Sequence, residues 1–177
     1  MKFLDSLATI IDALNEYIGR GTAWVALVMV LVQFAVVIMR YVFSIGFIPM
    51  QESIWYMHGI LFMFGAGYTL LHDGHVRVDI FYREASARRK ALVDMIGAVI
   101  FLIPLMALTM WLSWSYVINS WKTLEGSTEI SGLPLIFLYK TVIWVFAILL
   151  GLQAISMAVR GLQTLLGNET QPTTGGN

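Results

Sequence analysis

Four long stretches of apolar residues constrain the fold of this chain more than any other feature of the sequence. They cover residues 21–39, 53–71, 95–118 and 133–159. A helix needs roughly 20 apolar residues to cross a hydrocarbon core about 30 Å thick, and each stretch can supply them. The stretches are too long and too continuous for the strands of a membrane barrel. The sequence therefore predicts an all-α membrane protein with four transmembrane helices, at about 21–41, 52–72, 87–121 and 133–160.

The composition supports this class of protein. Hydrophobic residues make up 58% of the chain and charged residues only 12%, whereas about a quarter of the residues in a soluble domain are charged. A soluble protein with four buried helices is the alternative, but no stretch has a broad polar face. The formal net charge is zero, so no nucleic-acid partner is indicated. The absence of cysteine excludes disulfides, thiolate metal sites and cysteine nucleophiles.

The distribution of basic residues predicts the orientation of the helices, because cytoplasmic loops of membrane proteins carry an excess of Lys and Arg. One side holds Lys2, Arg20, Arg77, Arg83, Arg88, Arg89, Lys90 and Arg160, and the other holds Arg40 and Lys122. Both termini and the central loop are therefore expected in the cytoplasm. The four helices form one domain over 20–165, and the polar residues 166–177 predict a disordered cytoplasmic tail.

Residues 1–19 form a separate element in this interpretation. Apolar residues such as Phe3 and Ile10 recur at helical spacing, and Asp5 and Asp12 lie on the opposite face. The pattern predicts an amphipathic helix that is too polar to cross the membrane and lies along its inner interface. Because the polar face is acidic, we expect this helix to contact protein as well as lipid. Acidic residues before the apolar run argue against a signal peptide.

Histidine and acidic residues gather in the stretch LLHDGHVRVDIFY at residues 70–82. On one helix, His72, His75 and Asp79 would point the same way, as metal ligands do. However, Gly74 interrupts such a helix, and no fourth ligand is evident nearby. No serine-centred catalytic motif accompanies these groups. The sequence therefore favours a structural role for the stretch over a metal or catalytic site.

In the structural interpretation, Gly74 ends the second transmembrane helix as its cap. The two histidines then lie near the carbonyl end of that helix, where positive charge is favoured. Asp73, Arg77 and Asp79 follow at the headgroup level, where acidic and basic side chains can satisfy one another.

Haem binding and independent transport are further alternatives. A membrane cytochrome needs axial histidines on facing helices, but His58 and His72 lie on the same predicted helix. A transporter usually carries ionisable groups near the midplane of the membrane, whereas Glu52 lies at the outer edge and Lys140 within two turns of a helix start. Glu52 can pair with Arg40 or with Lys140, and the sequence leaves both pairings open.

Small residues in the second predicted helix allow another helix to approach closely. Gly59 and Ala66 are seven residues apart, and Gly65 and Thr69 are four apart. They can pack inside this chain or on a partner, and the sequence favours neither. The third predicted helix is roughly 50 Å long at about 1.5 Å per residue. It must tilt, kink at Pro104, or project beyond the outer surface.

Several motifs resemble one family of membrane proteins. Arg40-Tyr41-Val42-Phe43, Gln51-Glu52, GAGYTLLHDGHVRVD and GSTEISGLPLIFLYK occur in this order along the chain. In sequence and spacing, from about residue 5 to about residue 165, they resemble the DctQ-type small membrane subunit of tripartite ATP-independent periplasmic (TRAP) transporters. The resemblance implies four transmembrane helices, an amphipathic N-terminal helix, and a location in a bacterial or archaeal inner membrane.

The resemblance also implies partners: a large membrane subunit that carries substrate and sodium, a periplasmic binding protein that delivers an organic acid, and membrane lipids. It implies a scaffold subunit with no catalytic, cofactor-binding or metal-binding residues. An independent membrane protein, either a homo-oligomeric transporter or a redox anchor, is the alternative. Together with His72 and Asp73, the residues expected to be structural or interfacial are Arg40, Glu52, Gly74, His75, Arg77, Asp79, Pro134 and Lys140.

Overall fold

The computed structural model describes residues 2–76, 82 and 84–167, and this part of the chain is built from helices. They are α1 (Lys2–Tyr41), α2 (Ile48–Leu71), α3 (Ala87–Ile96), the π-helical segment η1 (Gly97–Leu102), α4 (Ile103–Thr123) and α5 (Ile136–Leu165). Because α3, η1 and α4 follow one another without a break, the described residues form four long helices, each long and apolar enough to cross a membrane. The predicted all-α membrane fold with four transmembrane helices is confirmed.

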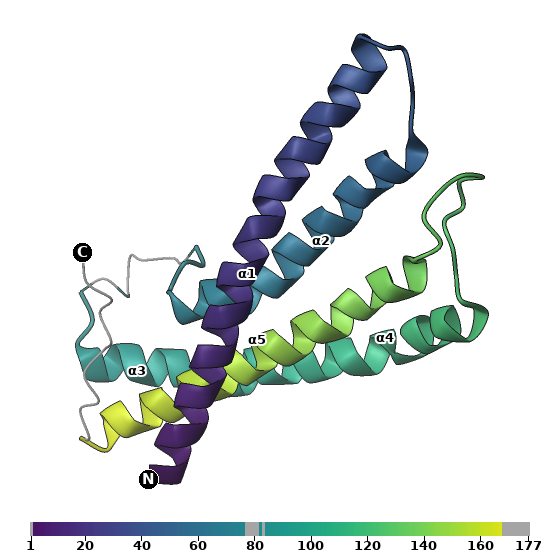
Figure 1. Ribbon diagram of the computed structural model, residues 1–177. Coiled ribbons are helices and arrows are strands. Elements are labelled where there is room, and N and C mark those ends of the chain that lie inside the picture. The colour runs from purple at the N-terminus through teal and green to yellow at the C-terminus, as the bar shows by residue number, and fades with distance from the viewer. Residues whose placement is uncertain (1, 77–81, 83, 168–177) are drawn as a thin grey trace.

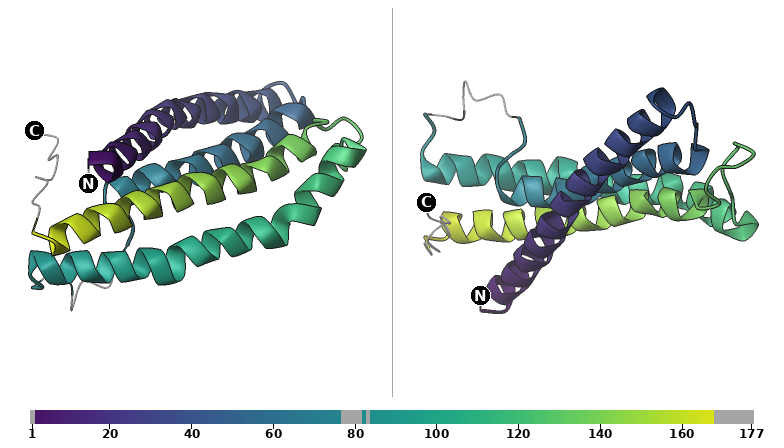
Figure 2. Two further views of the ribbon diagram at one scale, coloured as in Figure 1. Left: turned by 90° about the horizontal axis from the view of Figure 1, so that it is seen from below. Right: turned by 45° about the horizontal axis from the view of Figure 1, so that its top comes forward.

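The helices lie side by side in an open layer, in the order α1, α2, α5, α4 (Figures 1 and 2). Helix α5 contacts α1, α2, α3 and α4 and is the centre of the layer. In its most apolar stretch, 33% of the residues are buried, whereas the other long helices reach at most 11%. The layer leaves large apolar side chains exposed on its surfaces, as a hydrocarbon environment allows.

The start of α1 and the end of α5 lie at the same end of the layer (Figure 1). We name this the inner end, because the basic residues predict that it faces the cytoplasm, and we name the opposite end the outer end. The orientation itself remains a prediction.

The predicted N-terminal helix and the first transmembrane helix form one uninterrupted helix, α1. It crosses the other helices at an angle, and its inner half lies over α5 (Figure 2). Phe3, Ile10 and Tyr17 are 78%, 64% and 81% exposed, whereas Ala8 and Ile11 are buried. The inner half therefore turns its apolar stripe away from the protein. Its placement along the membrane interface stays a prediction.

The third long helix contains the π-helical segment η1, which ends two residues before Pro104. Proline has no amide hydrogen, and its ring crowds the carbonyl oxygen four residues earlier, here that of Ile100. A π-helical turn is wider than an α-helical turn and accommodates such a mismatch in the hydrogen-bond ladder. The third long helix curves along its length (Figure 2) and runs to Thr123, close to the predicted end at 121.

Helix α2 ends differently from the prediction. The sequence predicts Gly74 as the cap, but the left-handed backbone conformation is adopted by Asp73, with φ of 54°. The amide of Asp73 donates to the carbonyl oxygen of Leu70 at 3.2 Å, and that of Gly74 donates to Thr69 at 2.8 Å. This is the hydrogen-bond pattern of a Schellman cap. Aspartate tolerates the left-handed region better than most residues. Gly74 therefore follows the left-handed residue of the cap and does not itself adopt that conformation.

Candidate functional site: polar contacts between the helices

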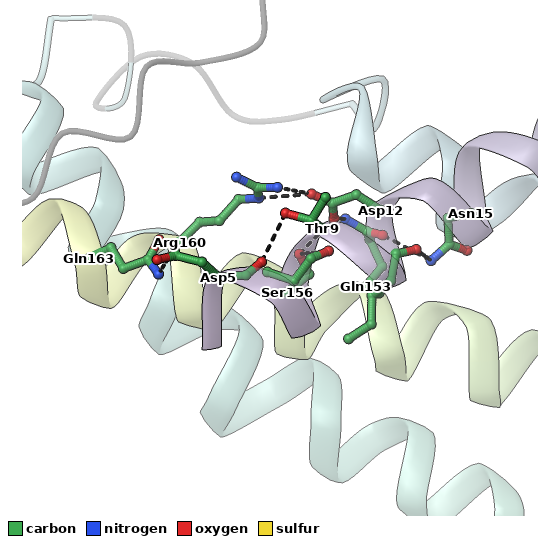
Figure 3. Close-up of polar contacts among 10 residues, drawn as sticks. Asp5, Thr9, Asp12, Asn15, Gln153, Ser156, Arg160 and Gln163 are labelled. Carbon is green, nitrogen blue, oxygen red and sulfur yellow. Dashed lines mark hydrogen bonds and ion pairs between the residues drawn. The ribbon is translucent and has the colours of Figure 1, made fainter. Parts of the chain in front are cut away.

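Asp12 of α1 is the centre of a polar cluster at the inner end of the layer (Figure 3). Its carboxylate accepts hydrogen bonds from Gln153 Nε2 at 2.9 Å and Ser156 Oγ at 2.6 Å. It also accepts from Arg160 Nε at 2.8 Å and from Arg160 Nη2. The three donor residues lie on one face of α5, and the Asp12 side chain is only 14% exposed. These hydrogen bonds offset the cost of removing the carboxylate from water. Because all of the donors come from α5, the cluster joins α1 to α5.

The Asp12 carboxylate also orients the amides beside it. A carboxylate can only accept hydrogen bonds, so Gln153 presents its amide nitrogen to Asp12 and its oxygen to Asn15. Asn15 Nδ2 donates to Gln153 Oε1 at 2.9 Å, and Asn15 is fully buried. One carboxylate therefore determines the direction of two further side chains.

Asn15 occupies space that is available only because residue 67 of α2 is glycine. A Cβ atom on Gly67 would lie 2.1 Å from Asn15 Oδ1 and 2.9 Å from its Cγ. Non-bonded atoms cannot approach so closely, and the hydrogen bond to Gln153 leaves Asn15 little room to move. Gly67 therefore allows α1, α2 and α5 to meet at one point.

A second contact joins α1 to α2. Glu16 Oε2 lies 2.6 Å from His72 Nε2, and Glu16 Oε1 accepts from Arg20 Nε at 2.6 Å. The His72 ring packs on Tyr68, with 4.4 Å between ring centroids. Tyr68 in turn lies over Gly19, where a Cβ atom would be 2.3 Å from the tyrosine ring. His72 is thus an interhelical contact at the end of α2, consistent with the structural interpretation of this stretch.

At the outer end, Glu52 holds the connection between α4 and α5. Its side chain accepts hydrogen bonds from Ser127 Oγ and, at 2.6 Å, from the Leu133 amide. Glu52 is only 5% exposed. A Cβ atom on Gly132 would lie 2.3 Å from Ser127 Oγ and 2.7 Å from Glu52 Oε1, so the loop passes there only without a side chain. The partners of Glu52 are therefore neither Arg40 nor Lys140, the two that the sequence left open.

Lys140 instead pairs with Glu125, the first loop residue after the α4 cap. Lys140 Nζ lies 2.5 Å from Glu125 Oε2 and 3.9 Å from the centroid of the Tyr116 ring. The Lys140 side chain is 13% exposed, whereas that of Glu125 is 40% exposed. The hydrogen bond from Lys140 is the main reason that the pKa of the Glu125 carboxyl lies below its ordinary value. The contact fixes the start of the outer loop to α5.

The remaining predicted residues do not gather at these contacts. Arg40 is exposed at the end of α1 and has no ion pair within the described residues, and His75 is exposed beyond α2. Pro134 precedes Leu135, the N-cap of α5, so it lies just before the helix, whereas the helix predicted over 133–160 includes it in its first turn. Arg77 and Asp79 lie outside the described residues. Among those described, no group of three or more His, Cys, Asp or Glu residues is placed to hold a metal ion.

The residues of the Asp12 cluster were not identified as site residues from the sequence. A signal was present: a line of polar residues recurs at helical spacing in the second half of the mostly apolar α5, at Gln153, Ser156, Arg160 and Gln163. Gln163 continues the line, since its Nε2 donates to Asp5 of α1 (Figure 3). The acidic face of α1 predicts contact with protein, but its sequence does not indicate that the protein is this stripe of α5.

Chemically, these contacts hold helices together. The carboxylates of Asp12, Glu16 and Glu52 accept hydrogen bonds from other residues of the chain, and Asp94 accepts from Tyr82 Oη at 2.6 Å. These groups lie towards the ends of the layer. These four carboxylates are therefore paired within the chain and have a structural role. This is expected, because an unpaired carboxylate is costly in a membrane.

Comparison with known proteins identifies the family. The family model described as "Tripartite ATP-independent periplasmic transporters, DctQ component" matches residues 29–164, well over half of the chain. No curated protein and no solved structure gives a match. The DctQ component is part of a transporter and not an enzyme. The chain therefore belongs to the DctQ family, the small membrane subunits of TRAP transporters.

Proposed function

We propose that this chain is a non-catalytic scaffold subunit of a sodium-coupled uptake system for organic acids. In this role it supports the large membrane subunit in the inner membrane, with both termini in the cytoplasm. Family membership supports the large subunit and the periplasmic binding protein as partners. Sodium coupling and an organic-acid substrate rest on the resemblance to the family alone.

The scaffold role is supported mainly by the polar side chains, which join the helices of this chain to one another. The Asp12 cluster joins α1 to α5, and the Glu16–His72 contact joins α1 to α2. The acidic groups in these contacts are held by fixed neighbours at the inner end, so they brace helices. A carrier needs ionisable groups that exchange partners with a moving ion near the midplane.

The outer loop supports a second part of the proposal. Glu52 and the Lys140–Glu125 pair fix both sides of the connection between α4 and α5. Glu129 and Ile130 remain exposed at its tip. We propose that this ordered loop helps to dock the periplasmic binding protein, which approaches from the outer side.

The scaffold role is tested in cells that produce the large subunit and the binding protein, with or without this chain. We expect sodium-dependent uptake of a radiolabelled organic acid only when the chain is present. Asp12→Asn should lower the amount of assembled complex and the uptake by the same factor, because each remaining complex works normally. Normal assembly with abolished uptake would show that Asp12 acts in transport, and full uptake without the chain would refute the scaffold role.

A further inference from the structure

Helix α2 has one face that this chain leaves uncovered. Trp55, His58, Phe62, Gly65 and Thr69 follow one another at intervals of three and four residues, which places them on one side of the helix. Trp55 and Phe62 are 67% and 69% exposed, and His58 is exposed between them. We name these five residues the open α2 face.

The rest of α2 is occupied by contacts within the chain. Gly59 faces Tyr139 of α5, and a Cβ atom there would lie 2.4 Å from the tyrosine ring. Gly67 receives Asn15, and Ala66 packs against the apolar cluster around Met106. The small residues that the sequence left unassigned therefore divide into two sets. Gly59 and Ala66 serve the packing of this chain, whereas Gly65 has nothing within 4 Å of the position its Cβ would take.

His58 indicates that something other than lipid covers the open α2 face. It lies ten residues after the start of α2 at Ile48, roughly 15 Å along the helix. This depth is well within a hydrocarbon core about 30 Å thick. No hydrogen bond or ion pair of the described residues involves the His58 side chain. Polar side chains inside a membrane usually face protein and hydrogen-bond across helices, because acyl chains offer no partner.

Gly65 suits the same kind of neighbour. It lies seven residues after His58, two turns along the same face, and its lack of a side chain lets another backbone come close. The Thr69 hydroxyl is satisfied by the Gly65 carbonyl oxygen at 2.9 Å, so the inner part of the face presents a small, satisfied surface. A partner helix can therefore approach closely at Gly65 while a side chain of that helix reaches His58.

We propose that the open α2 face is the docking site for a transmembrane helix of the large subunit, with a hydrogen-bonding side chain of that helix opposite His58. This inference rests on the proposed function, which supplies the partner. It adds which surface of this chain meets the partner and what chemistry the partner presents there.

The docking site is tested by photocrosslinking in the assembled complex. Phe62 is replaced by p-benzoylphenylalanine, and the matched control carries the same replacement at Leu112 of α4, which is 70% exposed. We expect the probe at 62 to crosslink to the large subunit and the probe at 112 to do so much less. A crosslink of the probe at 62 to a second copy of this chain, or to lipid only, would overturn the proposal.

Two substitutions test the face by affinity. Gly65→Leu fills space that is empty in this chain, so it should leave the chain folded and weaken recovery of the large subunit roughly tenfold or more. Gly21→Leu, also with nothing within 4 Å of its Cβ position, should have no effect. His58→Leu should weaken recovery about threefold, the size expected for one hydrogen bond between membrane helices.

The outcomes separate the two proposals. If the large subunit never co-purifies with the unaltered chain, the proposed function fails. If it co-purifies but is insensitive to Gly65→Leu and gives no crosslink from position 62, only the docking site is wrong.

Discussion

Replacing Gly67 by alanine should destabilise the chain through a single steric contact. The added Cβ would lie 2.1 Å from Asn15 Oδ1, and the next atom outside Asn15 is the Leu149 carbonyl oxygen at an ordinary 3.4 Å. Nearly all of the strain therefore falls on Asn15. Overpacking of this kind costs about 1–3 kcal/mol, and we expect the upper part of that range because Gln153 fixes the amide of Asn15.

The structure also predicts the size of the rescue. Asn15→Ala removes the clash and two interhelical hydrogen bonds, to Gln153 Oε1 at 2.9 Å and to the Leu149 carbonyl oxygen at 3.4 Å. Each such bond is worth about 0.6 kcal/mol in a membrane. Gly67→Ala in that background should then cost nothing further, so the double-mutant coupling energy should equal the whole cost of Gly67→Ala alone. The assay is reversible denaturation of the purified chain in mixed micelles, followed by circular dichroism.

Gly65→Ala is the matched control, because it lies two residues away on the same helix and has open space around it. It should be neutral or stabilising by up to about 1 kcal/mol, the helix-propensity gain of alanine over glycine. Equal effects of the substitutions at 65 and 67, or no rescue by Asn15→Ala, would refute the proposed packing of Asn15 against Gly67.

Two further predictions follow from the ion pairs. Asp12→Ala should destabilise the chain by about 1–3 kcal/mol, because it leaves Arg160 and Gln153 without their acceptor. Arg160→Ala combined with it should cost clearly less than the sum of the two single changes. Strict additivity in chemical denaturation would count against the cluster. Since the pKa of Glu125 is lowered in the folded chain, its contact with Lys140 contributes stability above the ordinary carboxyl pKa of 4.5, and this contribution is lost as the pH falls through the lowered folded-state pKa. The thermal midpoint of the unaltered chain should therefore drop more steeply than that of Glu125→Gln at acidic pH, and parallel curves would contradict this contact.

The helices could be predicted from the sequence because their apolar stretches match the thickness of a membrane. The predicted end at 121 for the third long helix is close to Thr123, and the π-helical segment beside Pro104 follows from the chemistry of proline. Length and hydropathy are local properties, so they can be determined from the sequence without knowledge of the tertiary structure.

The arrangement of the helices could not be predicted in the same way. In a membrane, surfaces facing lipid and surfaces facing protein are both apolar, so the pattern along α5 does not reveal that it is the central helix. The partner of Glu52 was also hidden, because Ser127 and the Leu133 amide carry no charge to mark them. Only the fold brings these loop groups to the carboxylate. The sequence offered Glu52 as the acceptor for Lys140, and only the fold brings Glu125 to it.

The most direct test of the account is sodium-driven flux through the purified chain in sealed vesicles. An inward sodium gradient is imposed, and uptake of radiolabelled organic acids is compared between vesicles with this chain alone and vesicles that also contain the large subunit and the binding protein. We predict that the chain alone takes up no more than protein-free vesicles, since the carboxylates of Asp12, Glu16 and Glu52 are held in contacts between helices and loops. Sodium-dependent uptake by the chain alone would contradict the scaffold role.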